Sequence, residues 1–322
     1  MGEADVALRH FVEQVRLLLG RDPIEGFRVW SALYTELAQG GLYDVCEELL
    51  LMVKGMDLPP YGLGIVRYGE GWMYDRSGHW NEAITAYEAA LAAFDGANMP
   101  MQTEILTQIG SLYQDQGDWV RAEEVYDRAL AVAADDHSRA LILNNLGGLC
   151  ALRGDQEQAR RHLMAAKATF DTTDDRYNYA AAGVGLASVL RDEGRLQDSV
   201  DQLAEAVLIF RDLGDAKALA TAVAGLALTY HMAGRRPEAA QTYRTALEVF
   251  VSIKDRSGIA KTLANLALLS ADAGDKDEAL AYLEQAVAEY QEIGDRHGEA
   301  LAVDQITRLT AVPPAPVDEG PS

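Results

Sequence analysis

The sequence predicts an all-α protein, folded as a right-handed superhelical solenoid of antiparallel helical hairpins. Three observations predict it. One block of residues recurs six times along the 322-residue chain, helix-favouring Ala is abundant, and no segment shows the apolar–polar alternation of a strand. A chain of this length exceeds one compact core, and a repeat array accommodates it.

The recurring block places a small residue seven positions before a Gly and an Ala five positions after it, as in Gly71, Gly78 and Ala83. The six turn glycines, spaced 39, 37, 40, 40 and 40 residues apart, are Gly78, Gly117, Gly154, Gly194, Gly234 and Gly274. Gly ends a helix readily because it adopts the left-handed conformation. A following Asp, such as Asp118, can cap the next helix, so each block predicts a helical hairpin.

The predicted hairpins divide residues 64–298 into six repeats. Their expected bounds are 64–102, 103–139, 140–179, 180–219, 220–259 and 260–298. Residues 1–63 are expected to hold an N-terminal helix over 4–20 and a degenerate repeat over 24–56, with a break at Leu58–Gly62. Residues 299–312 predict a capping helix. Residues 313–322, with four of the nine prolines, predict a disordered tail.

The segment Ile109-Gly110-Ser111-Leu112-Tyr113, with Gly117 and Ala122 after it, resembles the tetratricopeptide repeat. The resemblance extends over about residues 64–312, but the period here is about 40 rather than 34 and the closing proline is missing. This long period is similar to that of kinesin light chains and of sensor arrays in bacterial signalling ATPases and regulators. Junctions such as Ile293–Ala300 especially resemble the latter.

The formal net charge of −22 disfavours binding to nucleic acid or to an anionic membrane. It serves solubility, or else it attracts a basic partner. No apolar run is long enough to span a bilayer, and the N-terminus carries acids where a signal peptide needs basic residues. Cys46 and Cys150 lie far apart and imply no disulfide framework, so we expect a cytoplasmic protein.

Motifs that carry chemistry are missing from the sequence. It holds no phosphate-binding glycine loop, no His-Glu-x-x-His, no Cys-x-x-Cys and no Gly-x-Ser-x-Gly, and its six histidines are scattered. We therefore expect no enzymatic activity, no cofactor and no metal site.

The family resemblance implies a concave groove lined by the first helix of each hairpin. The candidate groove residues are Tyr68, Trp72, Arg76, Gln108, Asn144, Asn145, Arg191, His231, Lys261 and Asn265. Asn145 and Asn265 match the asparagine that grips a ligand's main chain in peptide-binding members. A carboxamide donates and accepts at once, so it suits a peptide group. The alternative is a solvated Asn, because other copies lack Asn at this position.

Trp72 has two interpretations. It is a binding hot spot, or the preceding hairpin over residues 28–56 covers it. The candidate cations Arg76, Arg191 and Lys261 fall in distant copies, so we do not expect a basic clamp for a carboxylate.

These observations predict a non-enzymatic scaffold or adaptor that binds a protein or extended peptide in its groove. Two alternatives stay open. One is a regulatory sensor module of a bacterial signalling system. The other is a self-assembling scaffold, which would make the chain a homo-oligomer.

Overall fold

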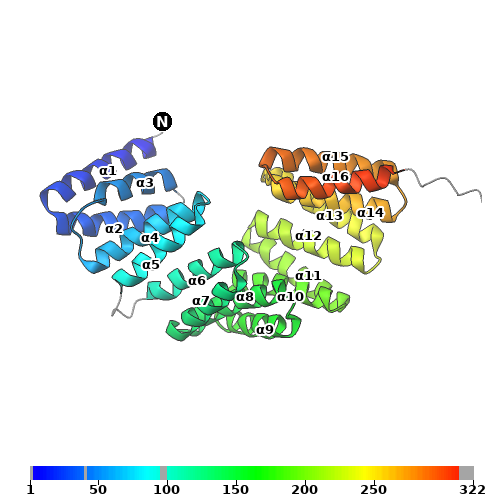
Figure 1. Cartoon of the computed structure of the whole chain (residues 1–322), viewed down its shortest axis with the longest axis horizontal. Helices are drawn as coiled ribbons and strands as arrows, with labels where there is room; N and C mark the ends of the chain where they lie inside the picture. Colours follow the sequence, from blue (N-terminus) through cyan, green and yellow to red (C-terminus); the bar gives the residue numbers. More distant parts are fainter. Residues whose placement is uncertain (1–2, 40–41, 95–99, 312–322) are drawn as a thin grey trace, which may run out of the picture. The chain divides into compact units, whose positions relative to one another are not determined.

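The computed structural model describes residues 3–39, 42–94 and 100–311, which form sixteen α-helices and no strand (Figure 1). This confirms the predicted all-α fold of repeated helical hairpins. The chain divides into two compact units, Met1–Ile142 and Leu143–Ser322, each of which is described by itself below.

The first unit is built of helices that pack in consecutive pairs, α1 on α2, α4 on α5 and α6 on α7. Its helices are α1 (Glu3–Arg21), α2 (Pro23–Gln39), α3 (Tyr43–Val53), α4 (Pro60–Arg76), α5 (Trp80–Ala93), α6 (Pro100–Asp115), α7 (Trp119–Val132) and the start of α8 (Asp136–Leu152). The break expected through Gly62 is shorter than predicted. Pro60 is the first residue of α4, a position where its missing N–H is no loss.

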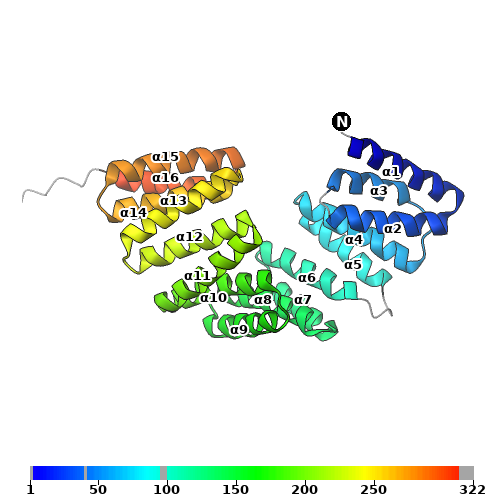
Figure 2. The ribbon, with the colours of Figure 1, turned by 180° about the vertical axis from the view of Figure 1, so that it is seen from behind.

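In the second unit each helix from α9 onward packs on the next, and α12 also touches α10 and α14. The helices are α9 (Gln156–Thr172), α10 (Arg176–Asp192), α11 (Leu196–Leu213), α12 (Ala216–Met232), α13 (Arg236–Ser252), α14 (Arg256–Asp272), α15 (Lys276–Ile293) and α16 (Arg296–Thr310) (Figure 2). Helix α16 stands where a capping helix was expected. The predicted tail over 313–322 lies outside the described residues.

The turns have the predicted geometry. All six turn glycines have positive φ, from 72° at Gly234 to 85° at Gly274. The side chain of Asp118 accepts a hydrogen bond from the backbone N–H three residues later, and Asp155 and Asp275 do the same. These caps satisfy amides that the start of a helix leaves without a partner.

A second turn recurs between consecutive hairpins of the second unit, at residues 174, 214, 254 and 294. All four residues have positive φ: Gly214 and Gly294 at 72° and 74°, Asp174 at 55° and Lys254 at 58°. Each is followed by an Asp whose side chain caps the next helix, at the start of α10, α12, α14 and α16. The conformation is unstrained for Gly and strained for Lys.

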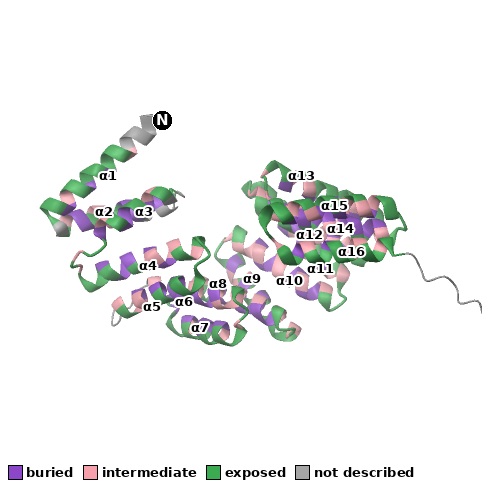
Figure 3. Cartoon of the chain, turned by 45° about the horizontal axis from the view of Figure 1, so that its top comes forward, coloured by how far each residue is buried: buried purple, intermediate pink, exposed green. Residues whose placement is uncertain are grey.

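Close contact within each hairpin depends on the small residue of the repeat. A Cβ on Gly71 would come within 2.5 Å of the Tyr87 ring, and one on Gly110 within 2.6 Å of Tyr126. Both rings are buried. Buried residues follow the helix faces that meet neighbouring helices (Figure 3), and they include Cys46 and Cys150, neither of which forms a disulfide.

Candidate functional site

The second unit contains a cavity of about 530 Å³ that extends across α10, α12 and α14, the first helices of three consecutive hairpins. It contains three of the predicted groove residues, Arg191 on α10 and Lys261 and Asn265 on α14. Its apolar lining includes Val184, Leu203 and Leu228. The cavity therefore combines an apolar floor with charged and hydrogen-bonding groups.

Cations dominate the charge of this cavity. Arg191, Lys217 and Lys261 line it, against a single acid, Asp255. Asp255 caps α14 by accepting a hydrogen bond from the N–H of Gly258 (3.0 Å). Lys217 and Lys261 are exposed and form no ion pair with any described residue. Arg191 and Lys261 fall in distant copies of the repeat, yet both line this cavity, because stacking the first helices brings α10 and α14 to it. The absence of a basic clamp for a carboxylate stays a prediction.

Asn265 is half-buried in this lining. Its carboxamide makes no hydrogen bond to another described residue. The neighbouring wall includes Gly225, which has no side chain, and a Cβ there would lie only 3.2 Å from the side chain of Leu203. Both N–H and C=O of the carboxamide are thus available to a peptide group.

Other predicted residues of the second unit do not line the cavity. Asn144 and Asn145 lie half-buried on α8. His231, on α12, is paired with a carboxylate: its Nε2 lies 2.9 Å from Asp272 Oδ2, and its side chain is only 9% exposed. This pair ties α12 to α14, so the predicted contact of His231 with a ligand gains no support.

The first unit has its own cavity, of about 730 Å³, lined by α2, α4 and α6. Tyr68 and Trp72 of α4 line it, as do Tyr34 of α2 and Glu104 of α6. The preceding hairpin therefore covers Trp72 only in part, and its role as a binding hot spot stays a prediction. Helix α2 of the preceding hairpin forms a wall beside the half-buried indole, but it leaves the cavity open.

Two predicted residues of the first unit do not line this cavity. The guanidinium of Arg76, in the last turn of α4, lies 5.2 Å from the centre of the Trp72 ring. Gln108 is half-buried on α6. Which of the ten candidates contact a ligand stays a prediction.

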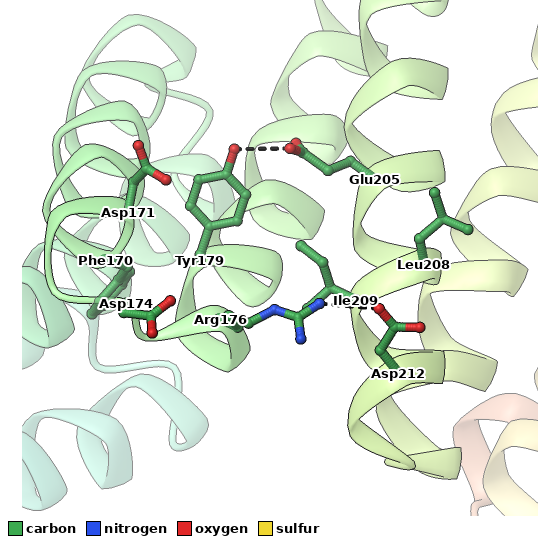
Figure 4. Close-up of a pocket in the computed structure, with 9 residues that line it drawn as sticks. All are labelled: Phe170, Asp171, Asp174, Arg176, Tyr179, Glu205, Leu208, Ile209 and Asp212. Atoms are coloured by element: carbon green, nitrogen blue, oxygen red, sulfur yellow. Dashed lines mark hydrogen bonds and ion pairs between the residues drawn. The ribbon is translucent and has the colours of Figure 1, made fainter.

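A third cavity, of about 400 Å³, opens beside the turn between α9 and α10 (Figure 4) and contains none of the predicted residues. Four carboxylates line it, but two of them are engaged. Arg176 donates to Asp212 (3.1 Å), and the hydroxyl of Tyr179 donates to Glu205 (2.9 Å). These bonds connect α10 to α11, so we assign the cavity a structural role.

Lining residues in both units are absent from the predicted set. Lys217 and Thr221 lie four residues apart on α12, on the stripe that continues to Ala224 and Leu228. Extending the register toward the start of each first helix would have found them. In the first unit, the hairpin over residues 28–56 was expected beside Trp72, but its repeat is too degenerate to single out Tyr34 as a lining residue.

The described part of the chain offers neither a membrane-spanning helix nor a cluster of metal-binding side chains. None of its helices combines the length and apolar character needed to cross a membrane. Nor do these residues bring together three His, Cys, Asp or Glu side chains that could hold a metal ion.

One family model, described as tetratricopeptide repeat, matches residues 102–171, 178–252 and 226–292. A second model with the same description matches residues 68–135. The chain belongs to the tetratricopeptide repeat family. A search of curated proteins found no match.

Solved structures similar to this tetratricopeptide repeat protein include the Cut9–Hcn1 hetero-tetramer of the APC/C, at 16% identity and a TM-score of 0.68. That match covers 93% of this chain and 52% of the other, so the chain spans about half of it. A Rap protein complexed with competence and sporulation factor matches at 14% identity and a TM-score of 0.59, covering 88% and 97% of the two chains. A signal transduction ATPase with a tetratricopeptide repeat sensor, from Pyrococcus horikoshii, matches at 12% identity and a TM-score of 0.62. That match covers 92% of this chain and 51% of the other. Identities this low establish the fold alone.

Proposed function

We propose that this protein is a non-enzymatic scaffold that holds an extended segment of a partner protein in the cavity across α10, α12 and α14. The observation that carries the proposal is the lining of that cavity. Arg191, Lys217 and Lys261 surround an apolar floor, and the half-buried Asn265 offers a carboxamide to it.

An extended segment suits this lining. Its peptide groups each present an N–H and a C=O, which the carboxamide of Asn265 can pair together. Its apolar side chains can cover Val184 and Leu228. Its carboxylates can bind the three cations, so we infer that the segment is acidic, although the net charge of −22 suggested a basic partner.

Selection from a library of random decapeptides tests the proposal. The bait is the full chain, and the selected peptides are then titrated against a Lys217→Ala/Lys261→Ala variant. The matched control is Arg236→Ala/Lys276→Ala, which removes two exposed cations from α13 and α15 of the same unit.

We expect the selected peptides to contain Asp or Glu and to bind the control variant like the wild type. The cavity variant should bind them about tenfold or more weakly, the loss that follows from removing close charge pairs. Peptides that bind both variants equally would move the site elsewhere on the protein. Recovery of neutral or basic peptides would reject the acidic segment.

A regulatory sensor is the second candidate, and the comparisons favour it. One similar structure is a Rap protein complexed with competence and sporulation factor, and another contains a tetratricopeptide repeat sensor. A sensor would bind a free effector, whereas a scaffold binds a segment within a larger protein. Calorimetry with the selected peptide, free and then inserted in a loop of a carrier protein, separates the two. Binding in both contexts supports the scaffold, and binding of the free peptide alone supports the sensor.

A further inference from the structure

We propose that the cavity lined by α2, α4 and α6 in the first unit is a second binding site, which takes an arginine or lysine side chain from a basic segment of a partner protein. This inference concerns other helices and the opposite charge. It does not depend on the function proposed for the second unit.

Aromatic rings form much of the cavity wall. Tyr61, Tyr68 and Trp72 follow one stripe of α4, and Tyr34 adds a ring from α2. Tyr61 is 52% exposed, and Tyr68 and Trp72 are half-buried, so their surfaces are accessible from the cavity. The faces of such rings attract cations. Trp72 already makes this interaction with Arg76 inside the chain, at 5.2 Å.

Carboxylates give the cavity a negative charge. Glu36 and Glu104 line it, and both are exposed. The basic residue in the lining, Arg28, is already paired, since it donates to both carboxylate oxygens of Glu25, at 2.8 and 2.5 Å. Glu36 has no cationic partner among the described residues. An incoming cation would therefore meet uncompensated negative charge.

A hydrogen bond holds one of these carboxylates against the aromatic wall. The hydroxyl of Tyr68 donates to Glu104 Oε1 at 2.6 Å, which links α4 to α6. Burial and the neighbouring Glu104 raise the pKa of Tyr68, so the phenol keeps its proton at neutral pH. Glu104 is thereby placed where a cation stacked on the Tyr68 or Trp72 ring could also form an ion pair.

The same features argue against an apolar occupant. A nonpolar helix or ligand filling the cavity would take Glu36 and Glu104 out of water without a cation to replace the lost hydration. A guanidinium offsets that desolvation and stacks on the rings at the same time. A volume of about 730 Å³ accommodates such a side chain together with part of its segment.

A pair of short peptides provides the test. The first is acetyl-Gly-Arg-Ala-Arg-Gly-amide with a neutral dye. The second replaces both arginines by citrulline, which keeps the shape and removes the charge. Anisotropy titrations use the full chain, a Trp72→Leu variant and a Glu36→Gln/Glu104→Gln variant. The control, Glu124→Gln/Asp127→Asn, removes two exposed acids from α7 of the same unit.

We expect saturable binding of the arginine peptide to the wild type and the control with equal affinity. The citrulline peptide and both cavity variants should each weaken binding about tenfold, in the range of a desolvated cation–π contact with its ion pair. Circular dichroism checks that each variant folds. Because glutamine can still accept the Tyr68 hydrogen bond, the glutamine variant tests charge even if Trp72→Leu loosens the unit.

Three outcomes would overturn the proposal. Equal binding of the citrulline peptide would show that the site does not recognise positive charge. An equal loss in the control variant would show general attraction by a chain of charge −22. The third is an absence of saturation at millimolar peptide. None of these outcomes touches the α10–α12–α14 cavity, whose variants and peptides are different.

Discussion

The ammonium of Lys167 lies 2.8 Å from the Glu205 carboxylate and joins α9 to α11 across the intervening helix. The side chain of Lys167 is only 12% exposed, and its Nζ lies 4.3 Å from the centre of the Tyr179 ring. Tyr179 in turn donates to Glu205 (Figure 4). Consecutive hairpins of the second unit are thus connected by a polar network as well as by apolar packing.

We predict that Glu205→Gln lowers the free energy of unfolding by about 0.5–1 kcal/mol at pH 7, a partly exposed ion pair being worth no more. Although desolvation opposes it, hydrogen bonds from Lys167 and Tyr179 leave the pKa of Glu205 below its usual value of 4.5. A lowered folded-state pKa gives stability that is present above the unfolded-state value and is lost as pH falls through the folded-state value. The difference between variant and wild type should therefore be smaller at pH 3 than at pH 7, because the carboxylate loses its charge as pH falls below 4.5. Urea titrations at both pH values measure it, and an unchanged difference at pH 3 would contradict this account.

Asp75 should show the opposite dependence on pH. Partial burial, and then the charge of Asp115, raise its pKa above the usual 3.8, while Arg76 opposes this. The folded state therefore binds the proton more tightly than the unfolded state, and this carboxyl makes stability fall as pH rises through the window above 3.8. We expect Asp75→Asn to raise the free energy of unfolding at pH 7 by less than about 1 kcal/mol, with a matching rise in melting temperature. Near pH 3 it should have no effect. The control Asp127→Asn removes an equal charge from the exposed face of α7. An equal gain in that variant would attribute the effect to net charge.

Lys254 is strained, and glycine should relieve the strain. It has φ 58° in the turn where the neighbouring repeats place Gly214 and Gly294. We expect Lys254→Gly to stabilise the protein by about 1 kcal/mol, since a left-handed conformation costs a non-glycine residue about that much. The reverse change, Gly214→Lys, should destabilise by a similar amount. Thermal unfolding of both variants tests this, and a destabilised Lys254→Gly would show that the Lys side chain matters more than its backbone.

The fold could be predicted because its signals are local. The conformation of Gly234 and the cap made by Asp255 are set by residues within a few positions of each, so one copy of the motif is enough to interpret them. The site could be predicted only in part. Lys217 and Lys261 come together only when α12 and α14 stack, and no local pattern marks that side of the helices. The rings of Tyr34 and Tyr61 line a cavity whose α2 wall comes from a repeat too degenerate to show which of its residues face the cavity.

Two adjacent glycines of α8 should respond in opposite ways to the same substitution. A Cβ on Gly147 would lie 2.6 Å from Cγ of the buried Leu163, whereas a Cβ on Gly148 would meet nothing within 4 Å. Alanine favours a helix over glycine by about 1 kcal/mol, and overpacking costs about 1–3 kcal/mol. We therefore expect Gly148→Ala to raise the melting temperature and Gly147→Ala to lower it. The loss in free energy of unfolding for Gly147→Ala should be up to about 2 kcal/mol. The double variant Gly147→Ala/Leu163→Ala should be no more stable than Gly147→Ala, because it exchanges overpacking for a cavity. If Gly147→Ala proved as stable as Gly148→Ala, the close approach of α8 and α9 would not depend on the small residue that marks every copy of the repeat.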